Sequence, residues 1–531
     1  MFQKLRAFLL IGALVAGSDA AAATIEPMGR DSSALAAAIA QAQPQDTVRL
    51  AQGTFELTDP VRPKSGIKLI GAGQGKTVIV YAGAKPSSLV SLADCEDVEI
   101  AHLTLDGRSI PLVQQGILAK SSRRLWLHHL TICNLKADTG SQHAILFSGH
   151  NPTMEGGVTD SRVSDCRIEN VGREAKFGGG IRMAWGSARN QVFNNTIHNT
   201  GRGGIFGDHS AELAIHNNRV SGSGGAGLGI EIWGGCPRSL IEDNCIDHWL
   251  SVDRGDRSAV RRNVIGADDG TLKPIGIEII ARDVVVTDNT VNRGARTGLS
   301  VSNTLVKNNV FWGYNTVRDC IQWGAQLQGE SGGIAHHYFY HCRFESTVRG
   351  DPRARYQDSG HGLRINGACR STVFEECGFS RNGGYGVQFL GGPSVGEIAF
   401  SRCLIRSNAL AAIRGTLQPG AIGFSGCTIE GNQSNQIPEA KPFPGVPPVA
   451  DFRLPEVIHA GETVPFQCLS KAAAGSIVER LWDFGHGIPE VTAGPTHRYD
   501  VPGTYRVTLI VWDKAGRGGR MEKMVRVLPS K

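Results

Sequence analysis

The sequence predicts an all-β protein, in which a right-handed parallel β-helix solenoid is followed by a small β-sandwich domain. Three observations support this fold class: a short segment recurs along most of the chain, the recurring units alternate apolar and polar residues, and Gly and Asn separate them. Units of this size cannot bury an apolar face alone, so they must stack on one another. Alternation with a period of two is typical of strands rather than helices.

The recurring segment is clearest at residues 192–197, 215–220 and 241–246, and its copies lie 19 to 36 residues apart. Each copy has one central position that Asn or Cys usually fills. Stacked Asn side chains can hydrogen-bond one another and the turn backbone, and we call this column the ladder. We place the ladder at Leu103, Leu130, Cys166, Asn195, Asn218, Asn244, Asn263, Asn289, Asn309, Cys342, Cys377, Cys403 and Cys427.

The ladder also bears on the 12 cysteines of the chain. Disulfides are the usual expectation for cysteines of a secreted protein. Cysteines at a ladder position are instead expected to be small, buried core residues. The seven cysteines outside the ladder leave room for one or two disulfides.

The chain divides into four predicted segments. Lys4 and Arg6 precede an apolar stretch that small residues follow, which predicts a signal peptide over residues 1–22 and a secreted protein. The stretch is too short to span a bilayer comfortably, so no membrane span is expected. The β-helix is expected over 24–436, a proline-rich, semi-rigid linker over 437–447 and the β-sandwich over 448–531. Residues 33–43 form helices readily, which predicts a helix that covers the open end of the solenoid.

Two parts of the chain resemble known families. Segments 46–55 and 66–71 are similar to the first coils of the pectate-lyase-like β-helix superfamily, and this resemblance runs from about Ala34 to Ser434. The superfamily contains lyases and hydrolases, so the resemblance implies a fold and not a reaction. Segments 482–487 and 502–505 resemble a polycystic-kidney-disease (PKD) domain, although His486 stands where that family usually has Asp. This second resemblance implies an immunoglobulin-like spacer or binding module of secreted, often carbohydrate-active, proteins.

Composition excludes some partners. The net charge of +6 is spread over 531 residues, and Lys and Arg do not gather in a recognisable nucleic-acid module. We therefore expect no nucleic-acid partner, and we expect a monomer. No His or Cys spacing suggests zinc, and no cofactor is certain.

The repeat allows outward-facing side chains to be placed in columns. Within each Gly-Ile-X-apolar strand, X must point away from the core, and stacked strands bring successive X residues into a row. We place in column 1 Leu118, Leu146, Arg182, Phe206, Glu231, Ser251, Glu278, Ser300, Gln322, Arg364, Gln388 and Arg414. Column 2, two residues further along each strand, contains Lys120, Ser148, Ala184, Asp208, Trp233, Asp253, Ile280, Ser302, Gly324, Asn366, Leu390 and Thr416.

Charged side chains concentrate in the middle of these columns, which makes that region the candidate site. The candidate catalytic residues are Glu231, Glu278, Asp253 and Asp208. The candidate substrate-binding residues are Arg182, His209, Trp233, Arg254 and Arg364. Carboxylates can transfer protons, Arg can bind uronate or hydroxyl groups, and an aromatic face can stack on a sugar ring.

Each of these assignments has a structural alternative. Asp208 and His209 could close a turn. Arg182 and Arg254 could simply pair with neighbouring acids. Trp233 could pack beneath the loop 345–360.

The spacing of the acids leaves more than one reaction open. Glu231 and Glu278 lie two strands apart, or roughly 9 to 10 Å at the backbone, which favours an inverting hydrolase, whose carboxyl groups are about 6.5 to 9.5 Å apart. Pairs on adjacent coils could meet the shorter distance of a retaining enzyme. A lyase would need a base, for which Arg182, His209 or Arg254 is available, and Asp208, Asp253 and Asp256 could hold Ca²⁺.

The sequence therefore predicts a secreted carbohydrate-active protein that cleaves glycosidic bonds of a polysaccharide, with uronate-containing chains among the candidates. Hydrolysis is slightly favoured over elimination. The main alternative is a noncatalytic surface or polysaccharide-binding β-helix protein, and a carbohydrate epimerase is a third.

Overall fold

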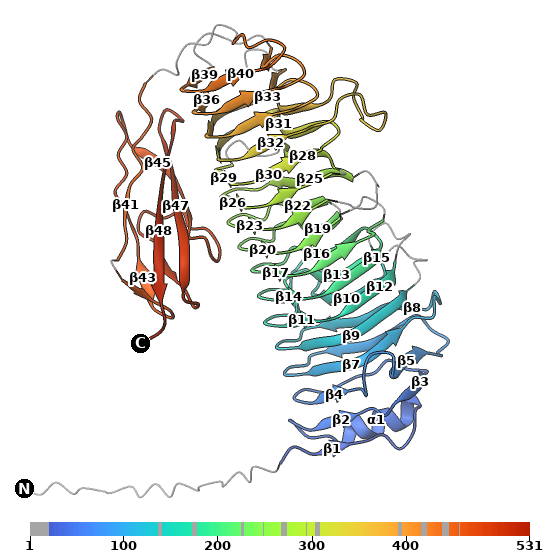
Figure 1. Cartoon of the computed structure of the whole chain (residues 1–531). Helices are drawn as coiled ribbons and strands as arrows, with labels where there is room; N and C mark the ends of the chain where they lie inside the picture. The colour runs from blue at the N-terminus through green and yellow to red at the C-terminus, as the bar shows by residue number, and fades with distance from the viewer. Residues whose placement is uncertain are drawn as a thin grey trace, which may run out of the picture.

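The computed structural model describes residues 21–531 except 136–140, 173–177, 225–227, 248, 267–272, 294, 303–307, 391–395, 416–421, 438–444 and 456. Most of the predicted signal peptide and of the predicted linker therefore lies outside the described residues, as does Thr416 of column 2. The described part of the chain has no helix with the length and hydrophobicity needed to cross a membrane. It consists of strands β1 to β48 and helix α1 (Ser32–Gln41), as Figure 1 shows.

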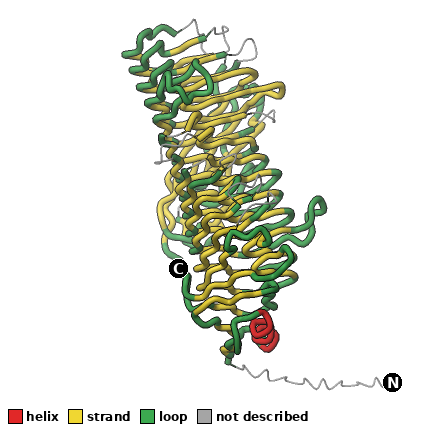
Figure 2. The backbone as a smooth tube through the Cα atoms, turned by 90° about the vertical axis from the view of Figure 1, so that its right-hand side faces the viewer, coloured by secondary structure: helices red, strands yellow, loops and turns green. Residues whose placement is uncertain are grey.

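Helix α1 lies at the N-terminal end of the solenoid (Figures 1 and 2), where the sequence predicts a covering helix. The Asp31 carboxylate accepts a hydrogen bond of 2.9 Å from the backbone N–H of Ala34, which caps the first turn. Leu35, Ala38 and Ile39 are buried and belong to the solenoid core. The helix therefore shields apolar residues that the first coil would otherwise expose.

The solenoid is built from parallel strands that fall into three faces, along which each strand pairs with its equivalent in the next coil. Face 1 contains β6 (Ser87–Ala93), β8 (Val113–Lys120), β10 (His143–Ser148), β13 (Gly179–Ala184), β16 (Gly203–Asp208), β19 (Leu228–Trp233), β22 (Trp249–Asp253), β25 (Lys273–Ile280), β28 (Ala295–Ser302), β35 (Val387–Phe389) and β38 (Ile413–Arg414).

Face 2 contains β1 (Thr24–Ile25), β2 (Thr47–Arg49), β4 (Lys68–Ile70), β11 (Arg162–Ser164), β14 (Gln191–Phe193), β17 (Ala214–His216), β20 (Leu240–Glu242), β23 (Ala259–Arg261), β26 (Val284–Thr287), β29 (Val310–Gly313), β36 (Ile398–Ser401) and β39 (Ile422–Ser425). Face 3 contains β3 (Gly53–Leu57), β5 (Thr77–Tyr81), β12 (Arg167–Val171), β15 (Thr196–Thr200), β18 (Arg219–Ser221), β21 (Cys245–Ile246), β24 (Val264–Ile265), β27 (Thr290–Val291), β30 (Thr316–Arg318), β32 (Arg343–Glu345), β34 (Gly378–Ser380), β37 (Leu404–Arg406) and β40 (Thr428–Glu430).

Four long strands pass from one face to the next. Strands β7 (Glu99–Asp106) and β9 (Trp126–Leu135) run from face 2 to face 3. Strands β31 (Trp323–Tyr340) and β33 (His361–Glu375) run from face 1 to face 2. In these coils the strand continues through the corner, and the paired strand of the next coil follows the same path.

The strand register of face 1 confirms column 1 apart from one member. Leu118, Leu146, Arg182, Phe206, Glu231, Ser251, Glu278 and Ser300 are consecutive partners. The next partner is Gln326, not Gln322, and Arg364 follows it. Gln322 lies just before β31 begins. The sequence pattern missed Gln326 because the residue before it is Ala325, where most other coils have Ile. The same shift replaces Gly324 by Gln328 in column 2.

The ladder runs through the corner between faces 2 and 3. The side-chain amide of Asn218 donates to Oδ1 of Asn244 at 3.0 Å, and Asn244 donates to Asn263 at 2.9 Å. Asn289 donates to Asn315 at 3.0 Å, so Asn315 holds the position that the sequence pattern gives to Asn309. Asn309 precedes strand β29 and instead donates to Asp283. The residues around Asn309 therefore match the ladder pattern only by coincidence, and the placement of Asn309 in the ladder is wrong.

Replacing Asn244 with Ala is expected to lower the free energy of unfolding by at least about 3 kcal/mol, because it leaves several buried polar groups without partners. Asn244 accepts from the backbone N–H and side chain of Asn218 and donates to the carbonyl oxygens of Ile215 and Glu242. Denaturant unfolding measures the loss. The control Asn217→Asp lies at the same corner on the surface, and similar losses in both variants would contradict this account of the ladder.

Nine of the 12 cysteines are buried, Cys427 and Cys468 are partly buried and Cys245 is exposed. Cys342, Cys377 and Cys403 are buried at successive ladder positions, and Sγ of Cys342 donates to the carbonyl oxygen of Trp312 at 3.2 Å. All 12 cysteines lie in the described part of the chain and all are free. The one or two disulfides that the sequence allows are therefore not formed.

The second domain is the predicted β-sandwich. One sheet has the strand order β42-β48-β47-β45, and β41 with β44 and β43 with β46 form two further pairs. Their bounds are β41 (Phe452–Arg453), β42 (Ile458–His459), β43 (Thr463–Pro465), β44 (Gln467–Cys468), β45 (Ile477–Asp483), β46 (Thr496–Arg498), β47 (Gly503–Asp513) and β48 (Gly518–Leu528). Trp482, Phe484 and Tyr499 are buried in its core.

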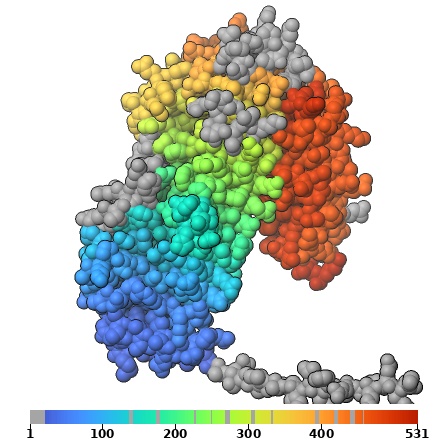
Figure 3. All heavy atoms as spheres, turned by 180° about the vertical axis from the view of Figure 1, so that it is seen from behind, coloured from blue at the N-terminus to red at the C-terminus, as the bar shows by residue number. Residues whose placement is uncertain are grey.

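The β-sandwich lies along the side of the solenoid (Figures 1 and 3), against face 2. An apolar cluster spans the contact and consists of Val285, Phe311, Tyr338, Leu481, Ile510 and Trp512. Arg261, only 1% exposed, donates from Nη2 to Oδ1 of Asp483 at 2.7 Å. Because both apolar packing and a buried ion pair cross the contact, the domain is docked rather than merely tethered.

Candidate active site

The centre of face 1 carries a group of charged side chains on β13, β16, β19, β22 and β25. The register places Asp208 beside Trp233 and places Ser251 between Glu231 and Glu278. Segments 173–177, 225–227 and 267–272, which precede β13, β19 and β25 in the sequence, lie outside the described residues. The description of the site is accordingly limited to the side chains of these five strands and of the residues next to them.

Glu231 is held by a cation that the sequence analysis missed. Nη2 and Nε of Arg202 donate to the two carboxylate oxygens of Glu231, at 2.6 and 2.9 Å. Such a paired contact fixes both the position and the orientation of the carboxylate. Glu231 is only 4% exposed, and burial raises its pKa above the ordinary value of 4.5, although the Arg202 guanidinium acts in the opposite direction.

Glu278 is held by hydroxyl groups instead. Ser251 Oγ donates to Oε2 at 3.0 Å, and Ser302 Oγ donates to Oε1 at 3.2 Å. The side chain is buried, with 9% exposure, and this burial raises its pKa. The negative charges of Asp253 and Glu231 raise the pKa further. The pKa of Glu278 is therefore higher than that of an ordinary Glu, which favours its protonated form.

Asp208 is at the centre of a short polar chain. Nη2 of Arg182 donates to Oδ2 of Asp208, and Nδ1 of His209 lies 2.6 Å from Oδ1. His209 adopts a left-handed backbone conformation, with φ of 52°, directly after strand β16. The side chain of Asp208 is buried, so it orients both Arg182 and His209. The predicted turn and the predicted cluster of charges therefore occur together.

Trp233, Asp253 and Arg254 form the exposed part of the site. Nε of Arg254 lies 3.3 Å from Oδ1 of Asp253, and its guanidinium lies 5.9 Å from the centre of the Trp233 ring. Trp233 remains 38% exposed, and the His209 ring meets it edge-on at 5.7 Å. Tyr356 of the loop 345–360 stacks on Trp323 instead, so the loop does not cover Trp233.

Arg364 does not belong to this cluster. Column 1 places it five strands beyond Glu231, a distance of about 24 Å at the usual strand spacing. Its guanidinium lies 4.2 Å from the centre of the Trp323 ring and 5.9 Å from that of Tyr356. The other eight candidates lie on neighbouring strands at the centre of face 1.

The proposed calcium ligands do not converge. Asp208 faces Arg182 and His209, whereas Oδ1 of Asp256 accepts a backbone hydrogen bond from Arg282 at 2.9 Å. Within the described residues, the carboxylates of Asp208, Asp253 and Asp256 do not form a group that could hold a metal ion. A calcium ion shared by Asp208, Asp253 and Asp256 would require these side chains to move.

Three residues that support the site were not predicted to have a role. Ser251 and Ser302 appear in the columns, but nothing in a serine indicates that it will bind a particular carboxylate. Arg202 precedes strand β16 and belongs to neither column. A search for cations that flank the glycine pair Gly203 and Gly204 could have drawn attention to it.

Comparisons with known proteins agree with both parts of the fold. A family model for the right-handed beta helix region matches residues 88–265, and a PKD domain model matches residues 445–527. The pre-pro-metalloprotease PrtV of Vibrio cholerae serotype O1 is 38% identical over 82 residues, which are 15% of this chain and 9% of that protein. This chain therefore spans a small fraction of that relative.

Two solved structures are similar to parts of this chain. The PKD1 domain of Vibrio cholerae PrtV is 37% identical, with a TM-score of 0.15, and covers 16% of this chain and 99% of that one. The pre-mature gene product 12 of bacteriophage phi29 is 15% identical, with a TM-score of 0.50, and covers 77% of this chain and 55% of that one. The second likeness concerns the fold alone. The chain is thus a right-handed parallel β-helix protein that carries a PKD domain after the solenoid.

Proposed function

We propose that the protein is a secreted enzyme that hydrolyses glycosidic bonds of a polysaccharide, with uronate-containing chains as the favoured substrates. The observation that carries this proposal is the position of a buried Glu278, whose pKa is raised, next to a more accessible Asp253 on the adjacent strand. Glycoside hydrolysis needs one carboxylic acid and one carboxylate on opposite sides of the bond. Export rests on the N-terminal sequence pattern.

In this proposal Glu278 protonates the leaving-group oxygen. Its Ser251 and Ser302 hydrogen bonds orient the carboxyl group, and its raised pKa keeps the proton available. Asp253 is two residues and one strand away, which separates the two Cα atoms by about 8 Å. In an inverting mechanism, Asp253 would act as the general base that activates the attacking water molecule.

The remaining groups bind the sugar chain. The guanidinium groups of Arg182 and Arg254 can bind a uronate carboxylate, and Arg is suited to this because of its forked geometry. The exposed ring of Trp233 can stack on the apolar face of a sugar. Glu231, fixed by Arg202, is a positioning residue that keeps negative charge beside Glu278.

A lyase is the second candidate, and one observation favours it. Asp208 binds Nδ1 of His209, which leaves Nε2 of the same ring to take a proton from a sugar carbon. A carboxylate that orients a histidine in this way is common in general-base catalysis. Elimination would create an unsaturated uronate, whereas hydrolysis would not.

The test is incubation of the protein with a panel of acidic and neutral polysaccharides, with and without calcium. New reducing ends without absorbance from unsaturated uronates are expected. Reducing ends accompanied by that absorbance would replace hydrolysis by elimination. If neither reducing ends nor absorbance appear with any polysaccharide of the panel, the enzymatic proposal is overturned. Retarded migration of the protein in a polysaccharide gel would then show binding alone.

A further inference from the structure

Three histidines gather at the corner between faces 2 and 3, away from the candidate active site on face 1. His102 belongs to β7, and His128 and His129 belong to β9. The register pairs Leu103 with Leu130, so His102 and His129 occupy equivalent positions in neighbouring coils. Both have left-handed backbones, with φ of 58° and 50°, which direct their side chains out of the corner. The adjacent strand residue His128 supplies the third ring.

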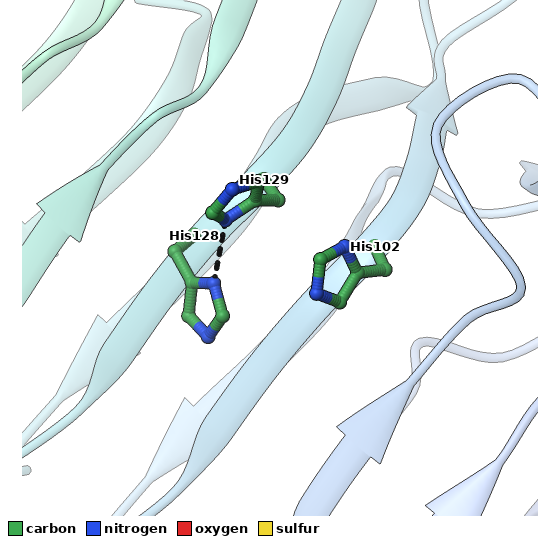
Figure 4. A group of neighbouring side chains, drawn as sticks. All are labelled: His102, His128 and His129. Carbon is green, nitrogen blue, oxygen red and sulfur yellow. Dashed lines mark hydrogen bonds between the residues drawn. The ribbon is translucent and has the colours of Figure 1, made fainter.

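The three rings face one another, as Figure 4 shows. One ring nitrogen from each histidine can be chosen so that all three lie within 4.8 Å of one another. Nδ1 of His128 lies 2.9 Å from Nδ1 of His129, and the ring centres of His102 and His129 are 4.8 Å apart. A tetrahedral ion with bonds of about 2.0–2.1 Å needs ligand nitrogens about 3.3 Å apart. Small rotations of the side chains would produce this spacing.

The surroundings of His128 resemble the outer shell of a metal site. Nε2 of His128, on the side of the ring opposite the other histidines, lies 3.3 Å from Oε1 of Glu99. Lys68 in turn lies 3.3 Å from Oε2 of the same carboxylate. Metal-bound histidines usually give their second ring N–H to a carboxylate, which fixes the tautomer and leaves the other nitrogen for the metal. The contact with Glu99 thus leaves Nδ1 of His128 for a metal ion.

Packing holds the same ring in place. The Trp126 ring stacks on His128 with centres 4.1 Å apart, and His128 is buried. The stacked Trp126 ring and the Glu99 carboxylate together restrict the orientation of the His128 ring. His129 is exposed, which leaves the outer side of the group open to solvent. One end of the group is therefore rigid and the other is accessible.

We propose that His102, His128 and His129 form a binding site for one zinc-like divalent transition-metal ion. Three imidazoles favour zinc, copper or nickel over calcium or magnesium, which prefer oxygen ligands. The three histidines supply three ligands, and water takes the fourth position on the open side. Because His102 and His129 belong to different coils, the bound ion cross-links β7 to β9 near the N-terminal end of the solenoid. It is a structural site that is independent of the proposed hydrolase activity.

The test uses the untagged full-length chain and ZnCl₂, with binding measured by calorimetry and the melting temperature measured in parallel. Co²⁺ provides a second readout, because a tetrahedral nitrogen site gives an absorbance band that weak surface binding does not. We expect one saturable site and a higher melting temperature with zinc. The double variant His102→Asn and His129→Asn should lose at least tenfold in affinity, together with the thermal shift. Asn suits these left-handed positions, since Asn194 and Asn217 occupy them in later coils.

The matched control is His341→Asn. His341 is also left-handed, with φ of 50°, and lies at the same corner, but its neighbours there are Glu376 and two tyrosines rather than histidines. This variant should bind zinc like the unmodified chain. The proposal is overturned if the unmodified chain shows no saturable site, or if the double variant and the control bind zinc equally. Because neither readout depends on catalysis, failure of the hydrolase proposal leaves this test unaffected.

Discussion

Replacing Glu278 with Gln is expected to lower the rate of glycosidic-bond cleavage by about 10²–10⁴-fold, because general acid catalysis contributes a factor of this size. Gln keeps the shape of the side chain. Its carbonyl oxygen can accept from one of the two hydroxyls, Ser251 or Ser302, while its NH₂ group donates to the other, so the fold should be unchanged. It cannot donate the proton that the leaving group needs. The measurement is the initial rate of reducing-end release on the polysaccharide that the panel identifies.

The dependence of this rate on pH provides a second readout. The reaction uses the protonated form of Glu278, whose pKa is raised by burial. The rate of the unmodified enzyme should therefore fall as the pH rises through that elevated pKa, and the residual rate of Glu278→Gln should lack this decline. Glu169→Gln, which alters an ion pair with Arg167 on face 3, is the matched control and should retain full activity. Equal rates for Glu278→Gln and the control would exclude Glu278 as the acid.

Replacing Arg261 with Met is expected to cost about 3–5 kcal/mol and to detach the PKD domain, because it leaves a buried carboxylate without its cation. Arg261 donates to Asp483 at 2.7 Å and to the carbonyl oxygen of Gly487, and both Arg261 and Asp483 are almost fully buried. Calorimetry should show an earlier, separate transition for the β-sandwich. Small-angle scattering should show a larger radius of gyration.

The neighbouring Arg262 offers a control of the same chemistry. Its guanidinium is about half exposed and pairs with Glu242 and Asp243 of the preceding coil. Exposed pairs contribute about 0–1 kcal/mol, so Arg262→Met should leave both measurements nearly unchanged. A compact Arg261→Met variant with unaltered unfolding would show that the apolar cluster and the other polar contacts, such as that of Arg520 with Glu375, hold the domain without this ion pair.

The sequence was sufficient to predict the solenoid because its signals are local and repeated. Strand alternation predicts the order of side chains in column 1, and the recurring Asn and Cys positions predict the ladder; the strand register and the Asn hydrogen bonds agree with most of these placements. The two errors of placement, Gln322 for Gln326 and Asn309 for Asn315, arise where another nearby segment fits the pattern equally well. Hydrogen bonding between coils decides between such segments, and that information is not local.

Contacts between distant segments could not be predicted in the same way. Arg202 reaches Glu231 across a coil boundary, and Arg261 reaches Asp483 across more than two hundred residues. His102 and His129 are 27 residues apart. This spacing does not indicate that they are neighbours until the register shows that both are left-handed residues at equivalent positions of adjacent coils. For such sites, the register must be known before the residues can be recognised as a group.

The docked β-sandwich also changes how the solenoid can open. In a free solenoid each coil contacts only its neighbours, so coils can unfold in succession from an end. Here the sandwich contacts successive strands β23, β26, β29, β31 and β33 through Arg261, Val285, Phe311, Tyr338 and Glu375. None of these coils can separate from the next without also breaking its contacts with the sandwich. The domain thus makes the coils from β23 to β33 unfold as one cooperative unit. The coils before β23 lack these contacts and can unfold separately.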